Sequence, residues 1–160
     1  MLVQTKEAAN LTGLESWQVQ SYAKQGFIRS AVRAKGAGTR KAYDVISLVK
    51  LVLLRQLTDD GFDLRTIRSI FSGLFDIPQL TSRGQANQLG NIRMWFRDKV
   101  LITAQRFNVR KMVRRERFLS IVEDLMIEYP GLYMIDLGTI VSQLLDRVVA
   151  LQFDKFEKAE

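Results

Sequence analysis

A short run near the N-terminus carries amide, hydroxyl, indole and ammonium groups at helical spacing. The residues are Trp17, Gln18, Gln20, Ser21 and Lys24. Amides and hydroxyls can hydrogen-bond to the edges of nucleic-acid bases, and a lysine ammonium can pair with a phosphate. An exposed indole is uncommon on a helix that has no binding role. These residue types therefore indicate a surface that contacts nucleic acid.

The element that must position these groups is the second helix of a helix-turn-helix. It is predicted to begin near Ser16 and to stop before Gly26. Its inward face consists of Val19, Tyr22 and Ala23. A preceding helix, capped by Thr5, is predicted to run through Leu11. Gly13 then gives the backbone freedom that a tight turn between two helices needs.

A basic hairpin is predicted to follow this helix. Residues 27–33 and 39–43 would form its strands, and Gly36 and Gly38 suit the tip between them. Residues 24–41 hold six basic side chains and no acidic one. We interpret a basic hairpin that directly follows such a helix as the wing of a winged helix-turn-helix. The alternative is a solvated hairpin whose charges prevent edge pairing.

Two further helices are predicted before residue 75. Asp44 is placed to cap a strongly apolar helix over residues 45–57, which must be buried on more than one side. Asp63 is placed to cap a helix that follows the Gly61-Phe62 break. The apolar residues of that helix keep helical spacing and are Leu64, Ile67, Ile70, Phe71 and Leu74.

The order of these elements resembles the DNA-binding head of the MerR family of bacterial transcription regulators, over residues 2–75. The matching pieces are Lys6-Glu7-Ala8-Ala9, Thr12-Gly13-Leu14, Tyr22 with Lys24-Gln25-Gly26-Phe27-Ile28, Arg40 through Tyr43-Asp44, and Leu57 with Gly61-Phe62-Asp63-Leu64 before Ile67-Arg68. The resemblance implies a homodimer on duplex DNA, with one recognition helix per half-site of an inverted repeat. It also implies that the promoter is bent and untwisted for RNA polymerase, a further partner. Glu15, Trp17 and Gln20 depart from the family pattern, so the preferred DNA sequence is expected to differ from that of relatives.

The residues expected to contact DNA come from the recognition helix, the wing and the helix after Asp63. They are Ser16, Trp17, Gln18, Gln20, Ser21, Tyr22, Lys24, Arg33, Lys35, Arg40, Lys41, Tyr43 and Arg65. Gln18 and Gln20 lie about 200° apart around a helix, so they cannot both point straight into the groove. We assign base readout to Gln18, with Trp17 and Ser21 beside it, and backbone contacts to Gln20 and Tyr22. Trp17 and Tyr22 have the alternative role of core aromatics.

Composition narrows the classes of function. The 160 residues include 24 basic and 17 acidic side chains, and the net charge of +7 favours a polyanionic partner. Cys and His are absent, which argues against disulfides, metal sites and histidine-based catalysis. Without a phosphate-binding glycine motif or a carboxylate constellation, neither an enzyme nor a cofactor is expected. No signal sequence or long apolar run is present, which predicts a cytoplasmic, nucleoid-associated protein without membrane contact.

The second half is predicted as a linker over residues 76–91 and a C-terminal domain over residues 92–160, after a head over residues 1–75. One alternating run is Ile92, Met94 and Phe96, and a second is Val100, Ile102 and Ala104. These runs favour a hairpin over the alternative of one helix. A helix with a basic start and an apolar remainder is predicted from Arg110 up to Tyr129, where the Pro130-Gly131 break ends it.

The last helix is predicted over residues 136–155. Its seam, with spacings of four and three, consists of Leu137, Val141, Leu144, Val148 and Leu151. Such a seam packs either on the preceding helix or on a second subunit, and we assign it to dimerisation because the resemblance implies a homodimer. The expected fold class is mainly α with small β elements, a winged helix-turn-helix followed by a helical module that includes a β-hairpin.

Two other functions remain open. A phage or mobile-element protein that shapes DNA, such as a recombination directionality factor, would use the same head without promoter control. A protein-interaction module would use the basic zones, residues 24–41 and 93–117, to hold an acidic partner. No small-molecule effector is assigned, because the aromatic residues that would line its site more often form a core. These residues are Trp95, Phe96, Phe107, Tyr129 and Tyr133.

Overall fold

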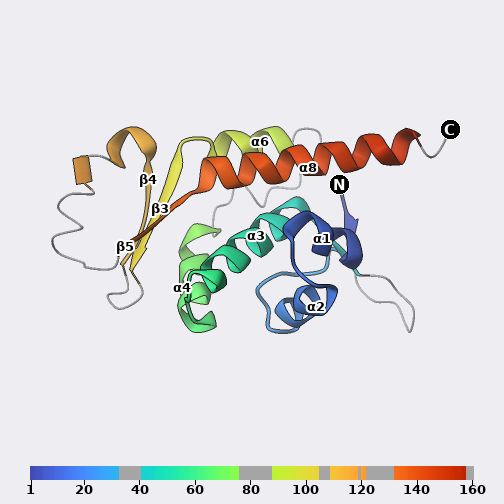
Figure 1. The fold of residues 1–160 in the computed structure, drawn as a ribbon, viewed down its shortest axis with the longest axis horizontal. Helices are drawn as coiled ribbons and strands as arrows, with labels where there is room; N and C mark the ends of the chain where they lie inside the picture. Colours follow the sequence, from blue (N-terminus) through green and yellow to red (C-terminus); the bar gives the residue numbers. More distant parts are fainter. Residues whose placement is uncertain (33–40, 76–87, 105–108, 119, 122–131, 158–160) are drawn as a thin grey trace. The chain divides into compact units, whose positions relative to one another are not determined.

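A computed structural model describes residues 1–32, 41–75, 88–104, 109–118, 120–121 and 132–157. Within these residues the fold is mainly helical with two small antiparallel sheets, which confirms the expected fold class (Figure 1). Contacts divide the chain into unit 1, Met1–Gly61 with Leu144–Glu160, and unit 2, Phe62–Gln143. No helix in the described part of the chain is long and apolar enough to cross a membrane.

Unit 1 contains the predicted helix-turn-helix. Its elements are β1 (Val3–Gln4), α1 (Thr5–Thr12), α2 (Ser16–Lys24), β2 (Ala42–Tyr43), α3 (Val45–Asp59) and the C-terminal part of α8 (Leu137–Glu157). The bounds of α2 confirm the prediction, and α1 packs against α2 and α3. The predicted cap of α1 is wrong by one residue, because Gln4 is the N-cap and Thr5 is already helical. The Gln4 amide donates to the Glu7 carboxylate at 3.0 Å, which completes a capping box.

The caps of the next two helices are as predicted. Asp44 accepts a hydrogen bond from the Ser47 amide at 2.8 Å and begins α3. Asp63 accepts one from the Thr66 amide, also at 2.8 Å, and begins α4 (Leu64–Leu74). The buried side chains of α3 occur around most of its circumference, which confirms that this helix is covered on more than one side. They are Val45, Ser47, Leu48, Val49, Leu51, Leu53, Leu54 and Leu57.

The predicted wing is only partly present among the described residues. Residues 27–32 do not form the first strand, because Phe27 and Ile28 are both buried and therefore do not alternate between two faces. The second strand is reduced to β2, which pairs with β1 through Val3 and Tyr43. Hydrogen bonds still join the two sides: the Ala42 carbonyl accepts from the Ala31 amide at 2.8 Å and from the Ser30 hydroxyl at 3.2 Å. The tip, residues 33–40, lies outside the described residues.

Unit 2 places a three-stranded sheet among helices. Its elements are α4, α6 (Gln88–Phe96), β3 (Lys99–Ala104), β4 (Val109–Arg114), β5 (Leu132–Asp136) and the start of α8. The sheet is antiparallel with β3 in the centre, in the order β4-β3-β5 (Figure 1). A hairpin is therefore present, but it joins β3 to β4. No strand was predicted at the position of β5, although its Tyr, Met and Ile residues suit a strand.

The prediction that residues 92–96 form a strand is wrong. Ile92 and Phe96 are buried, and the Phe96 ring lies 6.2 Å from that of Phe75. Met94 between them is 71% exposed. In a strand these three side chains would share one face, whereas in a helix residues 92 and 96 share a face and residue 94 points away. The helix α6 begins at Gln88, inside the predicted linker, and residues 76–87 lie outside the described residues.

The basic run from Arg110 was predicted as the start of a helix, and this prediction is also wrong. Residues 109–114 form β4, in which Val113 pairs with Val100 and Met112 with Leu101. The strand lies at the edge of its sheet, where charged side chains prevent pairing with other chains. Helical structure begins only at residue 115, and residues 122–131 lie outside the described part.

Asp136 joins β5 to α8 and ties both to the residue after β4. Its carboxylate accepts hydrogen bonds from the Thr139 amide at 3.2 Å and the Thr139 hydroxyl at 2.8 Å, and it forms an ion pair with Arg115. Partial burial raises the pKa of Asp136, but the hydrogen bonds from Arg115 and Thr139 outweigh burial and hold this pKa below its ordinary value. The ionised carboxylate therefore stabilises the folded chain.

We expect Asp136→Ala to lower the free energy of unfolding at pH 7 by about 1 kcal/mol, the usual cost of losing a helix cap. Because the folded pKa lies below the unfolded one, this stabilisation is complete above about pH 5 and is lost as the pH falls through the folded value. Urea unfolding at pH 7 and pH 3 measures the difference. Gln143→Ala, at an exposed position of the same helix, is the control. A gap between wild type and Asp136→Ala that is equal at both pH values would contradict the prediction.

The seam of the last helix is buried inside the single chain. Leu137 and Val141 belong to unit 2, whereas Leu144 and Val148 belong to unit 1. All four have exposed fractions of 2% or less, and Leu151 is half-buried. These side chains are covered by their own chain and are not available to a second subunit, so the structure does not support the predicted use of this seam for dimerisation.

Candidate nucleic-acid interface

The turn between α1 and α2 is fixed by a glycine and an arginine. Gly13 ends α1 with φ +69°, a left-handed conformation that side chains with a Cβ rarely adopt. The Arg55 guanidinium lies against Gly13, in the space that a Cβ would occupy, and donates from Nη1 to the Thr12 carbonyl at 3.2 Å. Arg55 also pairs with Asp59 at 3.5 Å. The angle at which α2 leaves the turn therefore depends on α3, which carries both Arg55 and Asp59.

A second arginine holds the same end of α1. Arg147 of α8 donates from Nη1 to the Leu11 carbonyl at 3.4 Å, within unit 1. The last carbonyls of a helix have no partner in the helix itself and carry partial negative charge, so cations are favoured there. Two helices that lie far from α1 in the sequence therefore supply the donors that stabilise its C-terminus.

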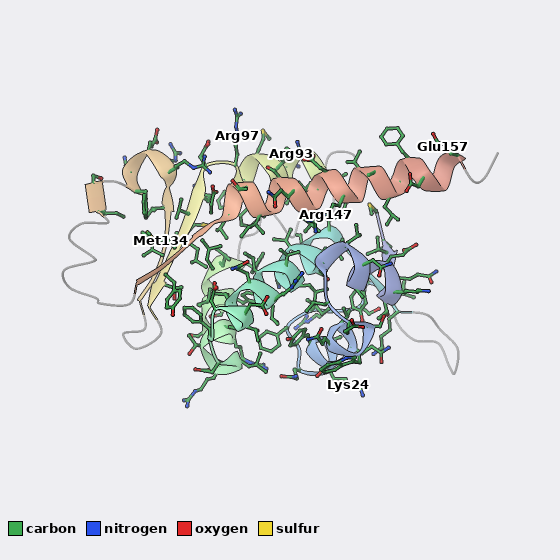
Figure 2. All side chains as sticks on the ribbon, in the orientation of Figure 1. Lys24, Arg93, Arg97, Met134, Arg147 and Glu157 are labelled. Atoms are coloured by element: carbon green, nitrogen blue, oxygen red, sulfur yellow. The ribbon has the colours of Figure 1, made fainter. Side chains whose placement is uncertain are left out.

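The outer surface of α2 is a stripe of exposed side chains. Trp17 is 67% exposed, Gln20 and Lys24 are also exposed, and Ser21 is half-buried. Positions 17, 20, 21 and 24 are spaced as one helical face. Figure 2 shows Lys24 on this helix, and the Ser21 hydroxyl accepts a hydrogen bond from Gln25 at 3.1 Å. We call Trp17, Gln20, Ser21 and Lys24 the outer stripe.

The Gln18 side chain is part of the cap at the start of α2 and not of the outer stripe. Its Oε1 accepts a hydrogen bond from the Glu15 amide at 2.8 Å, and the Glu15 side chain accepts one from the Gln18 amide in return. This reciprocal pair is a capping box that starts α2. Because Gln18 is half-buried and its acceptor is occupied, the structure places Gln20 rather than Gln18 in the centre of the exposed face.

Both tyrosines that were expected to contact DNA lie in the core of unit 1. The ring of Tyr22 is buried and meets the Phe27 ring edge-on, with centroids 6.1 Å apart. Tyr43 is 0% exposed. Burial raises the pKa of the Tyr43 phenol, and a hydrogen bond with Thr5 offsets only part of this change. Their side chains position α2 and β2 instead of forming part of the exposed surface.

The helix-turn-helix of unit 1 lies in a segment that matches a known protein family. Residues 3–74 match the family described as MerR HTH family regulatory protein. They therefore resemble the helix-turn-helix head of that family, over 72 of the 160 residues. A search of curated proteins finds no match to the chain. A helix-turn-helix domain of this kind suggests a DNA-binding transcription regulator.

The MerR head carries further exposed bases around α2 and β2. Lys41, which directly precedes β2, is exposed as expected. Arg29 is exposed too, and its carbonyl accepts a hydrogen bond from the Ser47 hydroxyl at 3.5 Å. Arg29 was counted in the basic zone but was not assigned to the DNA site, and only its place in that zone could have indicated it. Arg33, Lys35 and Arg40 lie outside the described residues.

Two further basic side chains lie on α3 and α4. Lys50 is half-buried in α3, and burial lowers its pKa, with Arg29 acting in the same direction and Asp44 in the opposite one. Lys50 is therefore a weaker candidate for phosphate than the exposed bases. Arg65 is exposed in the first turn of α4, in unit 2. Ser16, the first residue of α2, is half-buried.

Proposed function

We propose that this chain regulates transcription as a homodimer that recognises an inverted repeat in duplex DNA. Each MerR head would place the outer stripe of α2 in the major groove of one half-site, and the promoter would be distorted on binding. The observation that carries the proposal is the outer stripe itself, because a helix that exposes an indole, an amide and an ammonium on one face has the groups that the major groove can meet.

The roles within the site follow from position and chemistry. Gln20, in the middle of the stripe, has both an acceptor and donors and can pair with an adenine through N6 and N7. Trp17 offers an apolar surface to a thymine methyl group. Lys24, Arg29 and Lys41 have exposed cationic groups that suit phosphates and supply affinity without sequence preference. This assignment replaces the one based on sequence alone, in which Gln18 was the reader.

Selection of bound duplexes from a random pool tests the proposal most directly. We expect an enriched inverted repeat, with two half-sites about one helical turn apart or a multiple of it. Binding of the selected duplex should persist in excess competitor DNA. A pool without enrichment, or with single half-sites only, would contradict sequence-specific binding by a dimer. Bending can then be measured on the same duplex by the distance between dyes at its two ends.

The wing is expected to supply affinity rather than specificity. Changing Arg40 and Lys41 to Ala should weaken binding to all duplexes to a similar extent, because phosphate contacts carry no direct sequence information. The slope of log K against log salt should become shallower by up to about 2, at about 0.9 per phosphate contact. Titrations at four salt concentrations give this slope, with Lys6→Ala, an exposed change on α1, as the control. An unchanged slope would place the wing away from the DNA backbone.

A further inference from the structure

Outside α2, the two most exposed large apolar side chains in the described residues are Met94, 71% exposed, and Phe153, 67% exposed. Met94 lies on α6 and Phe153 near the end of α8. Arg93 and Arg97 are exposed next to Met94, together with Asp98, whereas Asp154 and Glu157 are exposed next to Phe153. Exposed apolar side chains with charged neighbours are typical of surfaces that bind a partner.

The platform around Met94 is rigid and basic. Ile92 and Phe96 fix α6 by turning into the core of unit 2, and this directs Met94 outward. Arg93 on α6 and Arg97, the first residue after α6, are both exposed near it, and Figure 2 labels both arginines. The Arg97 carbonyl lies so close to Gly138 that a Cβ there would overlap it, so the backbone below Arg97 is held against the start of α8. We call Arg93, Met94 and Arg97 the α6 platform.

The end of α8 has the opposite character. Val148 is the last fully buried residue of the helix among those described, yet α8 continues to Glu157. Beyond residue 148 the large apolar residues whose side chains are described, Val149, Leu151 and Phe153, are half-buried or exposed, so this end is only partly covered by its own chain. Asp154 and Glu157 are exposed beside Phe153. We call Phe153, Asp154 and Glu157 the α8 tip.

We propose that the α6 platform of one protomer binds the α8 tip of a second copy of this chain. Two platforms would repel each other, as would two tips, whereas a platform and a tip attract. A methionine thioether also packs favourably against an aromatic ring, which suits Met94 against Phe153. Each copy carries one platform and one tip, so both surfaces are present in any pair of copies. The inference rests on the homodimer of the proposed function and names its interface.

Charge reversal and its rescue test this interface. The dissociation constant of the full chain is measured by sedimentation at several concentrations. We expect Arg97→Glu, and separately Asp154→Lys with Glu157→Lys, to weaken the dimer about tenfold or more, because each places like charges together. Combining the two sets should restore the dissociation constant to within about threefold of wild type. The matched charge control is Arg117→Glu, an exposed change in unit 2 that should leave the dimer unchanged.

Apolar variants test the centre of the contact. Met94→Ser and Phe153→Ser should each weaken the dimer, whereas Met134→Ser, at an exposed position on β5, should not. A dimer that none of these changes affects, or charge variants that fail to rescue each other, would overturn the interface and leave the homodimer standing. A wild-type chain that binds a selected inverted repeat as a single copy would overturn the homodimer as well. Loss of DNA affinity in Arg97→Glu without loss of dimer would assign the platform to phosphate instead, and would also overturn the proposal.

Discussion

Val148→Asp is expected to destabilise the helix-turn-helix head, although residue 148 lies in the last helix of the chain. Val148 is 0% exposed and belongs to unit 1 with α1, α2 and α3. A carboxylate at this position would have to remain in an apolar interior, which costs at least about 3 kcal/mol of the free energy of unfolding, or it would force α8 away. Urea unfolding followed by circular dichroism measures the loss.

The same helix provides the control for this prediction. Ala150→Asp adds the same charge two residues later at an exposed position, and it should change the free energy of unfolding by no more than about 0.5 kcal/mol. DNA binding by Val148→Asp should fall together with the folded fraction. A variant that unfolds at the same urea concentration as Ala150→Asp would show that the end of α8 does not pack in unit 1.

Gln20→Ala is expected to remove sequence preference at one base pair in each half-site. A glutamine that pairs with adenine contributes about 1–3 kcal/mol of discrimination, so the preference at that position should fall by about tenfold or more. Binding to random duplexes should persist, because Lys24 and the other bases still meet phosphates. Repeating the selection of bound duplexes with the variant gives the result position by position.

The Gln18→Ala variant distinguishes a role in base recognition from a role in the stability of α2. Gln18 closes the capping box of α2 with Glu15, so its loss should cost about 1 kcal/mol of stability while the selected sequence stays the same. If Gln18→Ala instead flattened one position and Gln20→Ala weakened all duplexes alike, α2 would enter the groove by a different face from its outer stripe.

The sequence was sufficient where local signals agreed with each other. The turn at Gly13, the caps at Asp44 and Asp63 and the apolar spacing of α3 and α4 each need only a few neighbouring residues, and all of these elements form as predicted. Local chemistry and tertiary packing favour the same structure in this half of the chain.

The sequence was insufficient where the same apolar residues fit both the two-residue period of a strand and the period of a helix. Ile92, Met94 and Phe96 alternate as in a strand, but positions 92 and 96 also share a helical face, and the core beside Phe75 selects the helix. The basic residues before Arg115 suit a sheet edge as well as a helix, and only pairing with β3 distinguishes the two. Strand pairing connects distant residues, so it cannot be inferred from a local window.

The candidate site shows a similar limit at the level of single side chains. Helical spacing alone placed Gln18 and Gln20 on opposite sides of α2, but it could not show which side faces outward. The deciding observation is a hydrogen bond between the Gln18 side chain and the Glu15 backbone. Residues with a capping-box spacing are therefore better assigned to the helix start before they are assigned to a ligand.

The contact of Arg147 with the end of α1 affects when the head can fold during synthesis on the ribosome. Unit 1 needs residues 144–157 of α8 as well as the N-terminal helices, and the whole of unit 2 is translated between them. At about 5–20 residues per second this interval lasts several seconds, during which the nascent head lacks part of its core and a donor for α1. An incompletely synthesised chain would therefore not hold α2 in its final position. We expect only chains that include all of α8 to bind DNA.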